Sequence, residues 1–304
     1  MDVSICIPVF NEKNAVRKTV LEAQNEMSKL NYKYEIIVVD DSSTDNSINE
    51  IIDLDIRIIR HKINLGGGVA RVTAIRFASG KVVLQTDADG TYPTSCFKEI
   101  LEKAMINDLV IGARIRESAT DWHYLRVFIK WTLKTFASIL SGQKIPDLNS
   151  GLRAYKRDLG LKYEYLYPRG HSIMSTMTLA FLTEGRSVDF VPIEYNIRIG
   201  KSSFHPIKDT YNYFLTIVRT TMMFNPLRIC IPPAMFFLFF ASFFLIRNLF
   251  YKNYQNLPYL LLFISILFFV LGVFSDQLSR ISKQIAKLTN QYLADESVVE
   301  IVKN

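Results

Sequence analysis

The sequence of 304 residues is poor in cysteine, proline and glycine. Its three cysteines (Cys6, Cys96 and Cys230) are far apart and have neither the spacing of a disulfide-rich module nor that of a zinc site, so we expect a reducing compartment. With 13 glycines and 10 prolines, the chain is neither collagen-like nor of low complexity. The charged share of 21% and the aromatic share of 12% exclude a disordered chain, and the length allows one large domain or two smaller ones.

Charge is absent from two stretches near the C-terminus. Residues 229–246 and 253–275 contain no Asp, Glu, Lys or Arg and are rich in Phe and Leu. At a rise of 1.5 Å per residue, each can cross or nearly cross a hydrocarbon core of about 30 Å. A soluble core would have to be very large to cover both, so a membrane hairpin is favoured over two buried helices. The short segment between them, 247–252, allows only a tight turn, which puts both ends of the hairpin on one side of the membrane.

The N-terminus lacks a basic region followed by a long apolar run, so we expect no signal peptide. More basic residues flank the outer ends of the hairpin than its turn, and this places the outer ends in the cytosol by the positive-inside rule. We therefore predict a two-pass membrane protein with its long N-terminal part and both termini in the cytosol.

Short apolar segments alternate with helical patterns through the first third of the chain. The patterns predict strands at 3–10, 35–39, 56–59, 81–86 and 109–111, and helices at 12–30, 44–52, 66–78 and 95–105, the second capped by Ser42, Ser43 or Thr44. This alternation predicts an α/β domain with a mainly parallel sheet covered by helices on both faces. Ligands of such sheets bind beyond the carboxyl ends of the strands.

Polar residues and glycines follow four consecutive predicted strands. They are Asn11-Glu12, the acidic and hydroxyl run 40–45, the run 64–68 with three glycines, and the run 87–93 with Asp87 and Asp89. Helix caps and turns would account for part of them, but two carboxylates one residue apart repel each other unless a cation lies beside them. Mg²⁺ or Mn²⁺ prefers oxygen ligands and shares them with phosphates, so we expect a diphosphate partner whose leaving phosphate the metal stabilises as a Lewis acid.

Residues 66–68 match neither the P-loop nor the dinucleotide-binding glycine pattern. A phosphate cradle at a helix N-terminus is one interpretation of this run. We favour the other, a tight turn that lets the following helix pack close to the donor.

Several motifs resemble those of the family 2 glycosyltransferases, which have the GT-A fold. The motifs are VSICIPVFNE, VVDDSSTD, LGGGVARVTAIRFASG and TDADGTYP, in this order. LNSGLRAYKRD, RGH and VPIEYNIRIGKSSF, followed by the hairpin, resemble the polyprenyl-phosphate branch, which includes the dolichol-phosphate mannose synthases. The resemblance covers about residues 3–276. It implies a metal-dependent, inverting hexose transfer from a UDP- or GDP-sugar to a polyprenyl phosphate in one displacement, with no nucleic acid partner.

The resemblance also implies roles for individual residues. Asp41 would accept a hydrogen bond from a ring N–H of the base, and Asp89 would be the principal metal ligand, with Asp87 near the ribose and the metal. Thr91 stands where several relatives have a metal-contacting Gln, and it is shorter than Gln. The other positions implied to contact the donor are Pro8, Phe10, Asn11, Glu12, Val39 and Ala88. The cations implied to contact phosphates are Arg114, Arg126, Arg198 and Lys201, although Arg126 could equally be a solvated charge on a helix.

A catalytic base is not evident in the sequence. Some relatives have a Glu where spacing from Gly170 places Thr176 here, whereas a phosphate monoester, with a second pKa of about 6, is already ionised and needs no base. Positioning and cationic stabilisation would then carry the rate. A hydroxyl acceptor on another membrane glycolipid or polysaccharide is the alternative, with His171 or Asp147 as base. A non-catalytic membrane scaffold is the second alternative.

The predicted domain organisation has four parts. Residues 1–204 form the catalytic domain, and 205–227 form a helix that either lies in the headgroup layer or packs on the sheet. Residues 228–276 form the hairpin, with spans at about 229–247 and 255–275, and 277–304 form a cytosolic tail. Apolar residues at helical spacing in 279–293 predict an amphipathic helix for a second protomer or the membrane surface. A processive synthase is disfavoured because Q-x-x-R-W is missing, and a nucleotidyltransferase because PVFNE follows the first strand.

Overall fold

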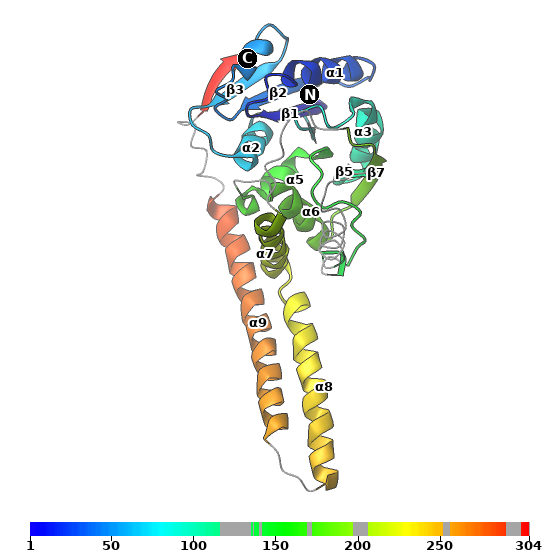
Figure 1. The fold of residues 1–304 in the computed structure, drawn as a ribbon, viewed down its shortest axis with the longest axis vertical. Helices are drawn as coiled ribbons and strands as arrows, with labels where there is room; N and C mark the ends of the chain where they lie inside the picture. The colour runs from blue at the N-terminus through cyan, green and yellow to red at the C-terminus, as the bar shows by residue number, and fades with distance from the viewer. Residues whose placement is uncertain are drawn as a thin grey trace.

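The computed structural model describes residues 1–115, 135, 137–139, 142–168, 172–196, 206–251, 256–289 and 299–303. These residues form a domain built on one eight-stranded sheet and a long helical hairpin that extends away from it (Figure 1). Of the described residues, those predicted to contact the donor lie in the sheet domain, and the two uncharged stretches lie in the hairpin.

The sheet is mainly parallel, as the sequence predicted. Its strands lie in the order β7-β5-β6-β4-β1-β2-β3-β8, and only β6 and β8 run antiparallel to their neighbours. The parallel neighbours of β1 are β2 and β4, so the carboxyl ends of these strands share one edge, where the polar runs begin. The strand bounds are β1 (Val3–Val9), β2 (Tyr34–Asp40), β3 (Arg57–His61), β4 (Val82–Gln85), β5 (Leu109–Arg114), β6 (Arg153–Lys156), β7 (Val188–Ile193) and β8 (Val299–Lys303).

Helices cover both faces of the sheet. One core cluster joins the strands to α1 and α3 through residues such as Val20 and Phe97. The other joins them to α2 and α6 through residues such as Ala74 and Phe181. Alternate strand residues belong to the two clusters, as expected for strands that are buried on both sides. The helix bounds are α1 (Val16–Ser28), α2 (Gly67–Phe77), α3 (Phe97–Ile106), α5 (Arg157–Lys162), α6 (Ile173–Thr183) and α7 (Pro206–Phe224), with 3₁₀ turns η1 (Ser47–Glu50), η2 (Thr94–Cys96) and η3 (Glu164–Leu166).

The prediction of a helix at 44–52 is wrong. Only η1 forms there, because Asn46 adopts a left-handed backbone conformation with φ 65° that ends any helix starting earlier. The side chain of Asp45 also bridges two loops, since it accepts hydrogen bonds from the N–H groups of Ser47 and Lys13. The first helix likewise begins at Val16 rather than at residue 12.

The two uncharged stretches lie in α8 (Leu227–Tyr251) and α9 (Leu257–Thr289), which run side by side (Figure 1). Both are long and apolar enough to cross a membrane, and most of their side chains are exposed rather than buried in a protein core. The helices pack closely where Gly272 faces Cys230, because a Cβ at Gly272 would lie 2.8 Å from the Cβ of Cys230. This exposure fits a lipid-facing hairpin better than a pair of core helices.

The chain returns from the hairpin to the sheet. Strand β8 adds to the free edge of β3, and Lys303 donates hydrogen bonds to the carbonyls of Ile52 and Leu54. Figure 1 accordingly shows the C-terminus beside β3, at the end of the domain far from the hairpin turn. The sequence pattern predicted only a helical tail here. Together with α7, which packs on α6, β8 attaches the hairpin to the domain at both of its ends.

Candidate functional site

The loops that follow β1 and β2 form one connected rim. The N–H of Asn11 donates to Ser43 Oγ at 3.0 Å, and the N–H of Thr44 donates to Asn11 Oδ1 at 2.8 Å. Asn11 itself has a φ of 56°, a conformation that asparagine tolerates better than most residues. The Glu12 N–H is bound in the same way by Ser47 Oγ. These hydrogen bonds therefore hold residues far apart in the sequence in one arrangement.

The predicted donor residues differ in their exposure. Phe10 is 46% exposed and Asn11 is exposed, so both side chains are accessible to a ligand, and Pro8 and Glu12 are half-buried. Val39 and Ala88 are buried in the core, so that any contact they make with a donor would come from their backbone. The contacts of all these residues with a nucleotide remain predictions.

Asp41, at the end of β2, is only 2% exposed and is bound by three donors. Its Oδ1 accepts from His61 Nδ1 at 2.7 Å and from the Leu65 N–H at 2.9 Å, and its Oδ2 accepts from the Gly66 N–H at 2.8 Å. Burial alone would raise the pKa of Asp41, but these hydrogen bonds outweigh it and lower the pKa below its usual value. The carboxylate is thus ionised, and most of its acceptor positions are used within the protein. A hydrogen bond from a ring N–H of the base, as predicted, would have to be accepted by Oδ2, which has only one donor among the described residues.

Asp87 is held by a cation that was not among the residues predicted from the sequence. Arg71 on α2 places Nη2 2.5 Å from Asp87 Oδ1, while its Nη1 donates to the Gly67 carbonyl. On the other side, a Cβ at Gly151 would lie 2.5 Å from Asp87 Oδ2, so the glycine is needed for the carboxylate to fit. Arg71 already supplies a positive charge beside Asp87, and the closeness of the two aspartates does not by itself require a metal ion.

Asp89 is oriented by the turn in which it lies. Its Oδ1 accepts hydrogen bonds from the Thr91 N–H at 3.1 Å and from the Thr91 hydroxyl at 2.6 Å. Thr91 is fully buried, and its hydroxyl proton is directed to Asp89. The geometry gives Thr91 the role of orienting Asp89, and direct ligation of a metal by Thr91 stays a prediction that these contacts disfavour.

Arg114, at the end of β5, forms a bidentate ion pair with Asp147. The distances are 2.7 Å from Nε to Oδ2 and 3.0 Å from Nη2 to Oδ1. The guanidinium also lies over the ring of Tyr195, 5.4 Å from its centroid, and Tyr195 packs edge-on against Tyr92 of the Asp89 turn. These aromatic rings link Arg114 to the aspartate turn, so the structure places the predicted phosphate-binding cation at the same edge of the sheet.

Of the two residues considered as a base for a hydroxyl acceptor, Asp147 and His171, only Asp147 lies in the described part of the chain. Burial would raise the pKa of Asp147, but hydrogen bonds from Arg114 and the charge of its guanidinium outweigh this and lower the pKa. A carboxylate so stabilised is a weak proton acceptor. Thr176, the position of the Glu in some relatives, is buried on α6.

A buried arginine holds the backbone of segment 147–151. Arg153 is fully buried, and its Nε and Nη2 donate to the Ser150 carbonyl while Nη1 donates to the Met174 carbonyl. Burial lowers the pKa of Arg153 to about 10, so it remains charged at neutral pH. It fixes the backbone that brings both Asp147 and Gly151 to the site.

Four of the predicted residues lie outside the described part of the chain. They are Arg126, His171, Arg198 and Lys201. Their roles stay predictions from the sequence.

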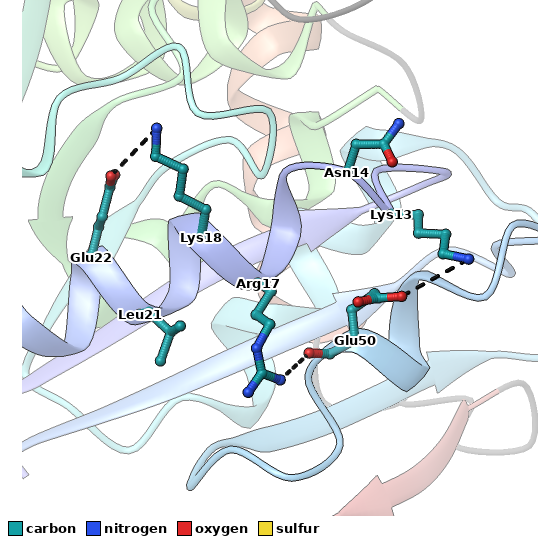
Figure 2. A pocket seen from close by; sticks show the side chains of 7 residues that line it. All are labelled: Lys13, Asn14, Arg17, Lys18, Leu21, Glu22 and Glu50. Atoms are coloured by element: carbon teal, nitrogen blue, oxygen red, sulfur yellow. Dashed lines mark hydrogen bonds and ion pairs between the residues drawn. The ribbon is translucent and has the colours of Figure 1, made fainter.

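A hollow of about 530 Å³ lies elsewhere, on the outer side of α1 (Figure 2). Its charged side chains are paired with one another, Lys18 with Glu22 and Lys13 with Glu50, while Arg17 is bound to Asp53 and to the Glu50 carbonyl. None of the predicted donor or metal residues lines it. This hollow is therefore not the site described above.

Comparison with known proteins matches both parts of the chain. The family model "Glycosyl transferase family 2" matches residues 4–161, and the model "GtrB C-terminal hairpin" matches residues 225–281. The undecaprenyl-phosphate mannosyltransferase of Micrococcus luteus is 25% identical over 215 residues, which cover 66% of this chain and 87% of that protein. The dolichyl-phosphate hexose transferase of Haloferax volcanii is 28% identical over 209 residues, which cover 67% of this chain and 87% of that protein.

Solved structures resemble the sheet domain. Glucosyl-3-phosphoglycerate synthase from Mycobacterium tuberculosis, crystallised with Mn²⁺ and UDP-glucose, aligns with a TM-score of 0.56 over 72% of this chain and 79% of that one, at 16% identity. At this identity the likeness shows the fold alone. That fold is the GT-A fold expected from the motifs.

Proposed function

Because the chain belongs to glycosyl transferase family 2, we propose that it is a membrane-associated hexosyltransferase that moves a sugar from a nucleoside-diphosphate sugar to a polyprenyl phosphate. The observation that carries this proposal is that a family 2 domain and a GtrB-type hairpin occur in one chain. The relatives named for undecaprenyl-phosphate and dolichyl-phosphate acceptors support the lipid class. Both UDP- and GDP-sugars are compatible with this proposal as donors.

The aspartate turn is suited to share a divalent cation with the donor. Asp87 and Asp89 offer carboxylate oxygens, the ligands that Mg²⁺ and Mn²⁺ prefer. Within the described ranges, no group of three or more His, Cys, Asp or Glu side chains is placed to hold a metal ion. We therefore propose that these two residues supply the protein ligands and that the donor diphosphate completes the set. A bound Mg²⁺ or Mn²⁺ would supply positive charge to the leaving diphosphate.

The protein's own residues would bind and orient the reactants. The rim around Asn11 and Asp41 would hold the nucleoside, and Arg114 would offer its guanidinium to a phosphate, held in direction by Asp147 and Tyr195. An acceptor phosphate is ionised near pH 7 and needs no proton removed before it attacks the anomeric carbon with inversion. The low pKa of Asp147 and the hydroxyl at position 176 agree with such an acceptor, because neither group is a strong base.

The hairpin would bring this site to the membrane surface. We propose that α8 and α9 span the bilayer, that the sheet domain and both termini lie in the cytosol, and that residues 1–204, 205–227, 228–276 and 277–304 act as catalytic domain, interfacial helix, hairpin and tail. Labelling of single cysteines introduced at the hairpin turn, such as Leu249→Cys, and on the domain, such as Leu21→Cys, would test this orientation. We expect an impermeant reagent on intact cells to label the turn alone, and labelling of the domain would contradict the proposal.

Sugar transfer by the full-length protein in nanodiscs tests the function. Radiolabelled UDP- and GDP-hexoses would be supplied with undecaprenyl or dolichyl phosphate, with and without EDTA, and the organic phase counted. We expect a lipid-linked sugar with one donor, lost in EDTA and restored by Mg²⁺ or Mn²⁺. Transfer to a dephosphorylated polyprenol or to a glycolipid hydroxyl instead would favour the hydroxyl-acceptor alternative. Nucleotide binding without any transfer would favour the scaffold.

A further inference from the structure

His61, the last residue of β3, is a buried histidine that the motifs do not assign. It is fully buried, and both of its ring nitrogens are engaged. Nδ1 lies 2.7 Å from Asp41 Oδ1 and Nε2 lies 2.9 Å from Thr73 Oγ1. Because an ionised carboxylate only accepts hydrogen bonds, Nδ1 carries a proton and donates it to Asp41.

These two contacts fix helix α2 at two points. Asp41, held by His61, accepts from the N–H groups of Leu65 and Gly66, which form the turn that starts the helix. Thr73 holds the helix directly, further along its length. His61 thus connects the end of β2 with both the start and the middle of α2.

Arg71 lies between these two points and carries the effect to the aspartate turn. Its guanidinium contacts Asp87 at 2.5 Å and the Gly67 carbonyl at 2.9 Å, so its position depends on where the first turn of α2 lies. A movement of that turn would shift both Arg71 and the backbone beside Asp41. Both sides of the proposed donor site therefore depend on the contacts of one imidazole.

We propose that His61 is a positioning residue for the nucleotide donor, holding Asp41 and the start of α2 so that Asp41 and Arg71 are set for donor binding. The proposal rests on the proposed function for the identity of the donor. His61 touches no ligand itself, because it is fully buried. Its effect is on the affinity for the nucleotide and not on the acceptor.

Substitutions at His61 separate this role from general stability. His61→Leu removes both hydrogen bonds, His61→Asn keeps an N–H that can reach Asp41, and Thr73→Val removes only the partner of Nε2. Tyr163→Phe is the matched control, because Tyr163 is also fully buried and hydrogen-bonded, to Glu184, but packs on α6 away from the start of α2. Calorimetry with UDP and GDP in Mn²⁺ gives the Kd, and transfer assays give kcat and the KM of each substrate.

We expect His61→Leu to raise the nucleotide Kd and the donor KM by about 10-fold or more, by analogy with the losses that follow when groups orienting metal ligands are removed. The acceptor KM should be unchanged, and His61→Asn should recover a large part of the affinity. An unchanged Kd in His61→Leu would overturn the proposal. The same loss in Tyr163→Phe, or no recovery in His61→Asn, would show that only stability is affected.

Hydrogen exchange gives a reading that needs no ligand. The amides of Leu65 and Gly66 should exchange faster in His61→Leu than in the wild type and the control, because their acceptor is then less well held. Unchanged exchange would also overturn the proposal. If the wild type bound nucleotide but formed no lipid-linked sugar, the proposed function would be wrong. The role of His61 would still be decided by the binding and exchange measurements.

Discussion

The carboxyl edge of the sheet and the hairpin differ in the side chains that they shield and expose. At the carboxyl edge of the sheet, charged groups are partly buried and paired with one another, as in the pairs Arg71–Asp87 and Arg114–Asp147. Along the hairpin, large apolar side chains such as Phe239 and Phe269 are exposed by more than half. A charge is stable in a protein interior only with a partner, and an apolar surface is stable only away from water. The two regions are therefore built for two solvents, and substitutions should affect chemistry in the first and membrane packing in the second.

The largest loss of activity is expected for Asp89→Asn at the carboxyl edge. The amide keeps the shape of the side chain and can still accept from Thr91, but it removes the negative charge proposed to hold a cation. We expect transfer to fall by roughly 10²–10³-fold or more, the loss typical of a key electrostatic group. The far-UV circular dichroism spectrum and the melting temperature should be nearly unchanged. Turnover like that of the wild type would rule out a role of Asp89 in metal binding.

Gly151→Ala should have the next largest effect. The new Cβ would lie 2.5 Å from Asp87 Oδ2, so the carboxylate has to move away from its place beside Arg71. We expect a loss of about 10-fold or more in kcat/KM, since small displacements of catalytic groups have costs of this size. Gly185→Ala is a control for the strain of an added methyl group, because a Cβ at Gly185 would meet no atom within 4 Å, while the backbone there has a φ of 71°. Equal effects of both changes on transfer would argue against the contact with Asp87.

Asp147→Asn tests the ion pair at the sheet edge through the pH dependence of stability. The folded-state pKa of Asp147 is lowered, so its ion pair stabilises the protein above its unfolded pKa of about 3.9 and this stabilisation is lost as the pH falls through the lower folded value. The variant should therefore be less stable than the wild type at pH 7, and the difference should shrink in acid, toward pH 3. Thermal unfolding of the two proteins from pH 7 to pH 3 measures this. A constant difference across that range would contradict the lowered pKa.

How far the sequence predicts the structure depends on the range of the interactions. Strands such as β1 and β4 follow from short apolar runs, and the uncharged stretches follow from composition alone. Arg71 was missed because nothing near it in the sequence shows that its guanidinium reaches Asp87 across 16 positions. Strand β8 was missed for the same reason, since Val299 pairs with His61 from the other end of the chain. The helix predicted at 44–52 failed because Asp45 bonds to a distant loop and Asn46 takes a left-handed conformation.

The smallest effect is expected in the hairpin, for Ser265→Ala. The Ser265 hydroxyl donates to the Ala234 carbonyl of the neighbouring helix at 2.7 Å, which is a polar contact between two mainly apolar helices. Such hydrogen bonds between membrane helices contribute only about 0.6 kcal/mol on average, because the separated helices find other partners. We expect a small fall in the stability of the detergent-solubilised protein and no change in the donor Kd. Ser242→Ala, on α8, controls for the loss of a hydroxyl from the hairpin. If Ser265→Ala changed donor affinity as strongly as Gly151→Ala does, the hairpin and the sheet edge would not be independent regions, and α7 or β8 would have to transmit the change between them.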